Sequence, residues 1–229
     1  MASKAILIGN SDGIGLAVTR RLLAAGWEVA GISRSPSPIT DVNYRHLVAD
    51  VTDAAFPEVI GELAATFKPD VCIYCAGIGD KIDFANLAAE VVVFDVNLMG
   101  MVKTAAAVLP GMIERKSGHF IGLSSLADEL NSGYSPSYSG SKAGFTRYLL
   151  SLDRAVRRRG VAVTNVRFGF VRTKMGKGAT RPFEMTVEKA ADHIERCLRR
   201  KPSNYSAPAI MLPLVKLTRV MLFFKSLRR

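Results

Sequence analysis

Short apolar runs alternate along the chain with longer segments in which apolar residues recur every three or four positions. The first such run covers residues 4–9, and the next two cover 27–35 and 43–51. Periodic segments follow the first and third runs, at 16–26 and 56–67. Runs of this length predict buried strands, and the periodic segments predict helices.

The same alternation continues through the rest of the chain. Glycine, proline and small polar residues separate the elements, as turns require. The later elements expected are strands at 70–79, 119–123 and 161–170, a helix at 87–112, a helix carrying Tyr138 that stops near Gly160, and a helix at 187–200.

Alternating strands and helices predict an α/β fold. A strand, a crossover helix and a parallel strand repeat to build a Rossmann-like doubly wound parallel sheet flanked by helices. With 229 residues, 48% of them hydrophobic, the chain can bury a full core as a single domain. We expect this domain to span residues 1–206, and residues 207–229 to form a basic, apolar tail that is helical.

A glycine-rich loop, GNSDGIG, connects the first strand to the first helix. Gly9, Gly13 and Gly15 leave room for a ligand, and the helix N-terminus behind them offers N–H groups to a pyrophosphate. Their spacing, G-x-x-x-G-x-G, differs from the commoner dinucleotide fingerprint G-x-G-x-x-G. A tight strand-to-helix corner without a ligand is the alternative. The loop residues expected to contact a dinucleotide also include Ser11, Asp12 and Ile14.

The end of the second strand predicts which dinucleotide binds. An acid there accepts from the ribose 2′-hydroxyl, whereas an arginine suits a 2′-phosphate. Arg34 follows Ser33, and no acid lies between Glu28 and Asp41. NADP(H) is therefore the preferred cofactor and NAD(H) the second choice. Asp12 argues mildly against this, and a solvated Arg34 is the alternative.

The ends of two further strands complete the expected cofactor site. Asp50 and Val51 end the third strand, where an adenine ring would lie against the chain. Ala76 and Gly77 leave the end of the fourth strand open for the nicotinamide ribose.

The cysteines do not indicate redox or metal chemistry. Cys72 and Cys75 form a C-x-x-C on a strand, where residues three apart face opposite sides, and redox pairs need a helix N-terminus instead. We expect small core residues and no metal site. Three cysteines agree with a reducing compartment, and the opening MASKAILIGN shows no charged-then-apolar signal segment, so we expect a cytoplasmic protein.

Residues 118–148 contain the expected reaction chemistry. Tyr138 and Lys142 are four residues apart and so share one face of a helix. An ammonium beside a phenol favours the phenolate, which lowers the tyrosine pKa from about 10 toward neutrality. If the preceding strand end turns Ser125 toward them, the three groups can handle the proton of an alcohol or ketone. Asn97 also stands out, because an asparagine in an apolar helix is costly unless its amide is satisfied.

Together these motifs resemble the short-chain dehydrogenase/reductase family over roughly residues 4–200. GNSDGIG is similar to the family's TGxxxGxG loop, and YCAG matches its NNAG segment in the last two residues. The sequence departs from the family pattern at Ile8, Tyr74, Cys75 and Phe168. Asn97, Ser125, Tyr138 and Lys142 fall on the family's catalytic tetrad in order and spacing.

The resemblance implies a role for each of these groups. Tyr138 would be the general acid in reduction and the base in oxidation, and Ser125 would hold the substrate oxygen, with Ser124 the other candidate. Lys142 would bind the nicotinamide ribose and lower the tyrosine pKa, and Asn97 would position a water. The remaining cofactor residues implied after the sixth strand are Val171 and Thr173. An NADP(H)-dependent carbonyl reductase or alcohol dehydrogenase is the leading hypothesis.

The net charge of +11 is concentrated in the last part of the chain. After Glu195 there are nine bases and no acid, so the rest of the chain is nearly neutral. The tail either packs on the domain or at a homodimer or homotetramer interface, which we favour, or lies on a membrane as an interfacial helix. Nucleic-acid binding is not expected, because aromatic residues are not interleaved with the bases. The alternative function is a non-catalytic dinucleotide sensor or scaffold that uses this basic tail.

Overall fold

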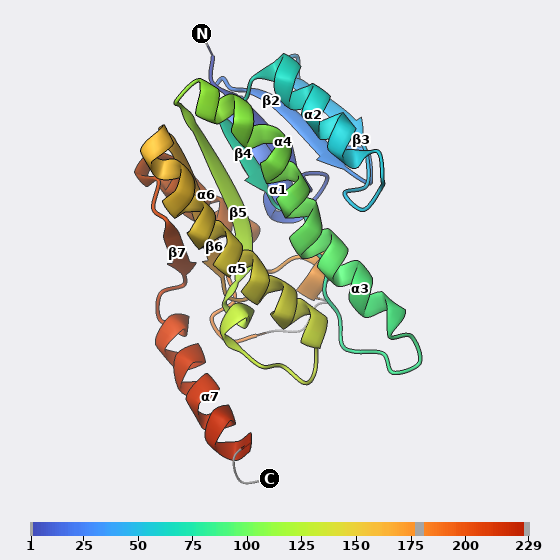
Figure 1. Ribbon diagram of the computed structural model, residues 1–229, viewed down its shortest axis with the longest axis vertical. Helices are drawn as coiled ribbons and strands as arrows, with labels where there is room; N and C mark the ends of the chain where they lie inside the picture. Colours follow the sequence, from blue (N-terminus) through green and yellow to red (C-terminus); the bar gives the residue numbers. More distant parts are fainter. Residues whose placement is uncertain (1, 177–180, 227–229) are drawn as a thin grey trace.

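A parallel sheet of seven strands forms the centre of the molecule in the computed structural model, which describes residues 2–176 and 181–226 (Figure 1). The strand order is β3-β2-β1-β4-β5-β6-β7, and every neighbouring pair is parallel. The expected α/β fold is therefore confirmed. The strands are β1 (Lys4–Ile8), β2 (Glu28–Ser33), β3 (Tyr44–Val48), β4 (Val71–Tyr74), β5 (Gly118–Ser125), β6 (Val161–Phe168) and β7 (Asn204–Ala207).

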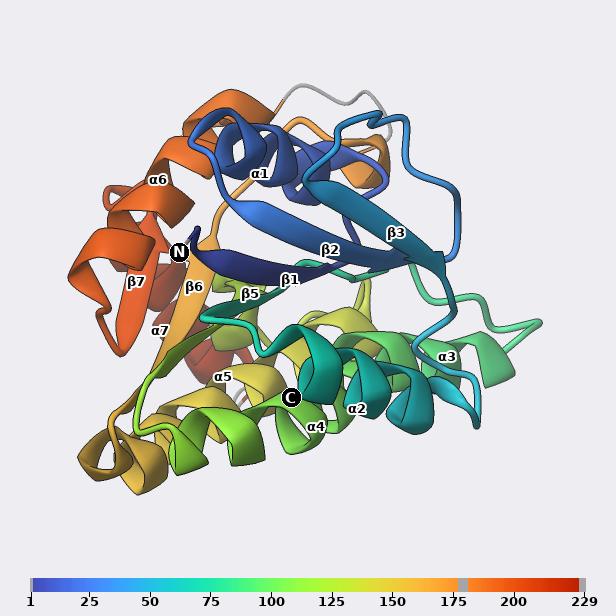
Figure 2. The same ribbon diagram turned by 90° about the horizontal axis from the view of Figure 1, so that it is seen from above.

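Helices cover both faces of this sheet (Figure 2). Helices α1 and α6 lie on one face, and α2, α4 and α5 lie on the other. Because central parallel strands are buried on both sides, they read in the sequence as continuous apolar runs such as AILI in β1. The helices are α1 (Gly13–Ala24), α2 (Phe56–Phe67), α3 (Ala88–Phe94), α4 (Gly100–Glu114), α5 (Pro136–Val156), α6 (Val187–Arg200) and α7 (Met211–Ser226).

The strand order reverses between β1 and β4. Strands β2 and β3 lie on one side of β1, and β4 to β7 lie on the other. Loops that leave neighbouring strands in opposite directions open a crevice at the carboxyl ends of the strands, where ligands of such sheets bind. The fold therefore puts the glycine loop after β1 and the end of β4 on the two sides of one crevice.

The helix expected at 87–112 is interrupted by a change of helical type. Helices α3 and α4 are joined by a π-helical segment, Asp95–Met99, which contains Asn97. A π segment widens one turn and re-aims the side chains that it carries, and such segments occur frequently at functional sites.

The C-terminal part contains a strand that the sequence does not predict. Strand β7, with the sequence NYSA, pairs with β6 although it lacks an apolar run. Helix α7 follows it and packs on the Leu126–Glu129 turn after β5 through Leu126, Met211 and Val215. Of the expected tail, residues 227–229 lie outside the described residues.

Candidate active site

A cleft of about 190 Å³ opens at the reversal of strand order, at the carboxyl ends of β1, β2 and β4. Nine of the residues expected to bind a dinucleotide line it. They are Gly9, Ser11, Asp12, Ser33, Arg34, Asp50, Val51, Ala76 and Gly77.

The glycines of the first loop are required by close backbone contacts. Gly9 has a φ of +81°, and a Cβ there would lie 2.6 Å from the backbone of Ala76. A Cβ on Gly15 would lie 2.2 Å from the carbonyl oxygen of Gly9, so α1 starts directly beneath the end of β1. Gly13 and Ile14 form the first turn of α1, whose N–H groups face the loop, as anion binding requires.

The electrostatics of this loop also suit a pyrophosphate. The first turn of α1 contains no acid, and the carboxylate of Asp12 pairs with Lys174 at 3.3 Å. This pairing offsets the negative charge that Asp12 brings to the loop. Thr173 lies beside the loop, since a Cβ on Gly13 would be 3.6 Å from its methyl group. Val171 forms an isolated parallel bridge with Met185. The residues present therefore fit a dinucleotide.

At the other end of the cleft, Arg34 lies at the end of β2 with its side chain 62% exposed. Its Nε is 3.7 Å from Oδ2 of Asp50, which is a long ion pair. Asp50 also accepts hydrogen bonds from the backbone N and the hydroxyl of Thr52, at 2.9 and 2.8 Å. An exposed guanidinium with so loose a partner remains available to an anionic ligand.

Gly77 connects the cleft to two of the expected catalytic residues. A Cβ on Gly77 would lie 3.4 Å from Oδ1 of Asn97 and 3.5 Å from Nζ of Lys142. The amide of Asn97, which is completely buried, accepts from the backbone N of Ile78 at 2.8 Å and donates to its carbonyl at 2.9 Å. It also donates to the hydroxyl of Ser141 at 3.0 Å. The π segment thus turns Asn97 toward the end of β4, where its amide is satisfied.

Lys142 is 4% exposed and forms no ion pair in the part of the chain that the structure describes. Its Nζ donates to the carbonyl of Leu123 at 2.8 Å and lies 4.9 Å from the ring centre of Phe145. Burial lowers the pKa of Lys142 to about 8, and the nearby Cys75 and Asp128 partly oppose this effect. The ammonium can therefore lose its proton near neutral pH.

Tyr138 lies one helical turn before Lys142, whose Nζ is 5.9 Å from the centre of the phenol ring. Burial raises the pKa of Tyr138 above its ordinary value, and a hydrogen bond with the Ser125 side chain opposes the shift. This direction is opposite to the one expected from the neighbouring lysine, because the cost of dehydrating a phenolate outweighs the Ser125 hydrogen bond and the charge of Arg181, the two influences that lower the pKa. The neutral phenol is the form that donates a proton. Gly79 leaves room for the ring, since a Cβ there would lie 2.4 Å from Cδ2 of Tyr138.

The geometry favours Ser125 over Ser124 as the serine of the site. Ser124 is buried, and its Oγ lies 2.8 Å from Oγ1 of Thr146 and 3.3 Å from the carbonyl of Lys142. Its hydroxyl is therefore used to hold β5 against α5. Ser125 is only partly buried, and it accepts from the backbone N of Ala127 at 3.1 Å. Its hydroxyl remains next to Tyr138.

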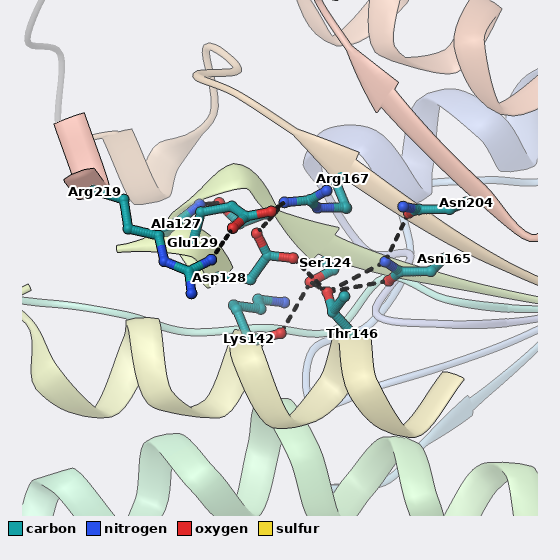
Figure 3. Close-up of polar contacts among 11 residues, drawn as sticks. Ser124, Ala127, Asp128, Glu129, Lys142, Thr146, Asn165, Arg167, Asn204 and Arg219 are labelled. Carbon is teal, nitrogen blue, oxygen red and sulfur yellow. Dashed lines mark hydrogen bonds and ion pairs between the residues drawn. The ribbon is translucent and has the colours of Figure 1, made fainter. Parts of the chain in front are cut away.

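A buried ion-pair network lies behind this site and was missed by sequence reasoning (Figure 3). Arg167, on β6, binds Oδ1 of Asp128 at 2.6 Å and Oε1 of Glu129 at 2.7 Å. Thr146, on α5, donates to Oδ2 of Asp128 at 2.6 Å, and Arg219 of α7 binds Oε2 of Glu129 at 2.9 Å. The available signal was an arginine inside the apolar strand VAVTNVRFGF, which requires a buried partner.

The Cys75 side chain also differs from the sequence expectation. Cys72 and Cys75 pack on opposite sides of the sheet, as expected for residues three apart along a strand. Cys72 is a core residue, but Cys75 also lines the cleft. Burial raises the pKa of the Cys75 thiol to about 12, so the thiol is unreactive near neutral pH.

Comparisons with known proteins assign the chain to one class, the oxidoreductases. The family model described as short chain dehydrogenase matches residues 3–182. The chain therefore belongs to the short chain dehydrogenase family. It is a dehydrogenase or reductase that acts on CH–OH and C=O groups.

Individual relatives agree with this assignment. An uncharacterized oxidoreductase of Myxococcus xanthus is 30% identical over 219 residues, which cover 89% of this chain and 87% of that protein. The 3-oxoacyl-acyl-carrier-protein reductase FabG of Escherichia coli is 30% identical over 181 residues, covering 75% and 74%. A Burkholderia cenocepacia short chain dehydrogenase in complex with NADP superposes with a TM-score of 0.85 at 20% identity, covering 94% of this chain and 92% of that one.

Proposed function

We propose that this protein is an NADP(H)-dependent oxidoreductase that interconverts a small-molecule carbonyl and its alcohol. The observation that carries the proposal is that Gly77 lies both in the expected dinucleotide cleft and beside the expected catalytic residues. The dinucleotide cleft ends there, and Asn97 and Lys142 approach the same glycine from two helices.

The bound dinucleotide would supply or accept the hydride, and the chain's own residues would manage the proton. Tyr138, whose pKa burial raises further above neutral pH, would donate its proton to the carbonyl oxygen, while Ser125 holds that oxygen by a hydrogen bond. Lys142, with its pKa lowered to about 8, would hold the ribose hydroxyls and return a proton toward Tyr138. Asn97 would fix the end of β4 and position a water beside Lys142.

Three observations support NADP(H) as the preferred cofactor. Arg34 is exposed at the mouth of the cleft, and its ion pair with Asp50 is long. The carboxylate of Asp12 is paired with Lys174. The Burkholderia cenocepacia neighbour was solved with NADP.

The cellular setting stays a prediction. We propose a cytoplasmic protein that forms a homodimer or homotetramer. The cysteines Cys72, Cys75 and Cys197 are free in the structure, which suits a reducing compartment.

The reaction is tested by Tyr138→Phe. This change removes the proton donor and keeps the ring, so turnover should fall by about 10²–10⁴-fold while NADPH binding, followed by fluorescence, changes little. Tyr148→Phe, on the same helix, is the matched control and should keep full turnover. If Tyr138→Phe turns over as fast as the wild type, the proposed proton transfer is wrong. If neither NADPH nor NADH binds the wild type, the oxidoreductase proposal fails and the scaffold alternative becomes the leading one.

The cofactor preference is tested by Arg34→Ala. Losing a charge-assisted contact to a 2′-phosphate should weaken NADPH binding by about 10- to 100-fold and leave NADH binding unchanged. Arg20→Ala, an exposed arginine on α1, is the matched control. Equal weakening of both cofactors would show that Arg34 does not read the phosphate.

A further inference from the structure

Among the side chains that the structure describes, α7 and Ile210 just before it present two apolar stripes, of which one is covered. Met211 and Val215 are buried against the Leu126–Glu129 turn. The other stripe follows the spacing i, i+4, i+7 and i+11, so its members lie on one face. These side chains are between 50% and 64% exposed: Ile210, Leu214, Leu217 and Met221.

The charge of this part of the chain indicates what would cover the exposed stripe. From Met211, where α7 begins, to Arg229 the sequence has five bases and no acid. A second copy of the chain on this stripe would bring two such basic segments together, which is unfavourable. A surface that is apolar inside and anionic outside complements both the stripe and the bases.

The position of α7 agrees with such a surface. In Figure 1, α7 projects from the body at the same end of the molecule as α3 and the segments that precede α3 and α5. Those segments expose large apolar side chains as well, namely Phe84, Leu87 and Tyr134. One end of the protein, which includes the mouth of the candidate active site, therefore offers several apolar groups.

A membrane-spanning helix is not the explanation for this end. Among the described residues, the one helix long and apolar enough to cross a membrane is Ala88–Glu114, and 44% of its apolar window is buried inside the protein. This helix contains the Asn97 segment and forms part of the core. Contact with a membrane would thus take place at its surface.

We propose that α7 docks this protein on an anionic lipid surface. Ile210, Leu214, Leu217 and Met221 enter the boundary between headgroups and acyl chains, and the exposed bases Lys216 and Arg219 contact the headgroups. The opposite stripe keeps α7 attached to the Leu126–Glu129 turn. The proposal does not depend on the cofactor or on the reaction.

The experiment is co-sedimentation of the full chain with vesicles of equimolar phosphatidylcholine and phosphatidylglycerol, and with vesicles of phosphatidylcholine alone. The protein should bind the anionic vesicles more tightly than the neutral ones, and added salt should weaken the binding. The double change Leu214→Ser/Leu217→Ser should weaken it by about tenfold or more. Lys216→Gln should weaken it by about fivefold.

The controls separate lipid docking from misfolding and from self-association. Val42→Ser changes an almost fully exposed valine in the loop before β3 and should bind as the wild type does. Circular dichroism and thermal melting should be the same for all variants. A wild-type protein that stays in the supernatant, or a double variant that binds normally, would overturn the proposal. So would an oligomer in size-exclusion chromatography that dissociates in the double variant, since a second copy would then cover the stripe.

Discussion

Lys142 and Arg167 are both buried cations, with exposed fractions of 4% and 5%, but their surroundings have opposite effects on their charge. Lys142 contacts a backbone carbonyl and an aromatic ring, and burial lowers its pKa to about 8. Arg167 contacts the carboxylates of Asp128 and Glu129, whose hydrogen bonds and charges outweigh burial and raise its pKa.

This difference shows how one protein uses buried charge in two ways. A cation without a carboxylate partner stays costly to ionise and so can exchange a proton near neutral pH. A cation between two carboxylates keeps its charge and ties together the elements that carry its partners. Asp128 belongs to both regions, because it binds Arg167 and its charge also raises the pKa values of Lys142 and Tyr138.

The comparison predicts the largest effect for Lys142→Met. The change removes the ammonium beside Gly77, so kcat should fall by about 10²–10⁴-fold, while the free energy of unfolding should stay the same or rise because methionine needs no hydration. Steady-state kinetics and urea unfolding measure the two quantities. Lys103→Met, on α4, removes a lysine that also donates to a carbonyl, that of Val51, and is the matched control. A variant that is unstable but fully active would assign Lys142 a structural role.

Arg167→Met should show the reverse pattern. Asp128 and Glu129 would lose their buried partner, so the free energy of unfolding should fall by about 3–5 kcal/mol. The double change Arg167→Met/Asp128→Asn should recover part of this loss, because it removes one of the two stranded charges. Arg154→Met, an exposed arginine on α5, should stay within about 0.5 kcal/mol of the wild type. Urea unfolding followed by circular dichroism measures these free energies of unfolding. If Arg167→Met loses no more stability than Arg154→Met, the buried ion pairs do not stabilise the fold as proposed.

These two cations also show what the sequence can predict. The interval between Tyr138 and Lys142 fixes their common helix face, and the glycine loop after β1 predicts a cleft that the structure places at the same edge. Arg167 and Asp128 are 39 residues apart, and nothing in the local pattern pairs them. Strand β7 is hidden because NYSA carries no apolar run and forms only by pairing with β6.

The direction of the tyrosine pKa was wrong for a related reason. The Tyr-x-x-x-Lys spacing shows the nearby ammonium, but it does not show how much water the phenol loses on folding. Burial is the largest influence on Tyr138, and it depends on segments distant in the sequence, such as the one that contains Gly79, which packs against the ring. Local spacing therefore predicts which groups meet, and the folded surroundings determine their charge.

The smallest expected effect is a pH dependence that separates the two cations directly. The pKa of Lys142 is about 8 in the folded protein and 10.5 as its ordinary value, so between these pH values the unfolded chain binds more protons. The free energy of unfolding of the wild type, relative to Lys142→Met, should therefore rise with pH across this window, by up to about 3 kcal/mol. The free energy of unfolding of the wild type relative to Arg167→Met should not change with pH across this window, because the pKa of Arg167 is raised above its ordinary value and Arg167 keeps its charge there. Urea unfolding of the three proteins at several pH values across the window measures how each difference in the free energy of unfolding depends on pH. If both differences change equally with pH, Lys142 does not titrate there and Arg167 is not distinct from it.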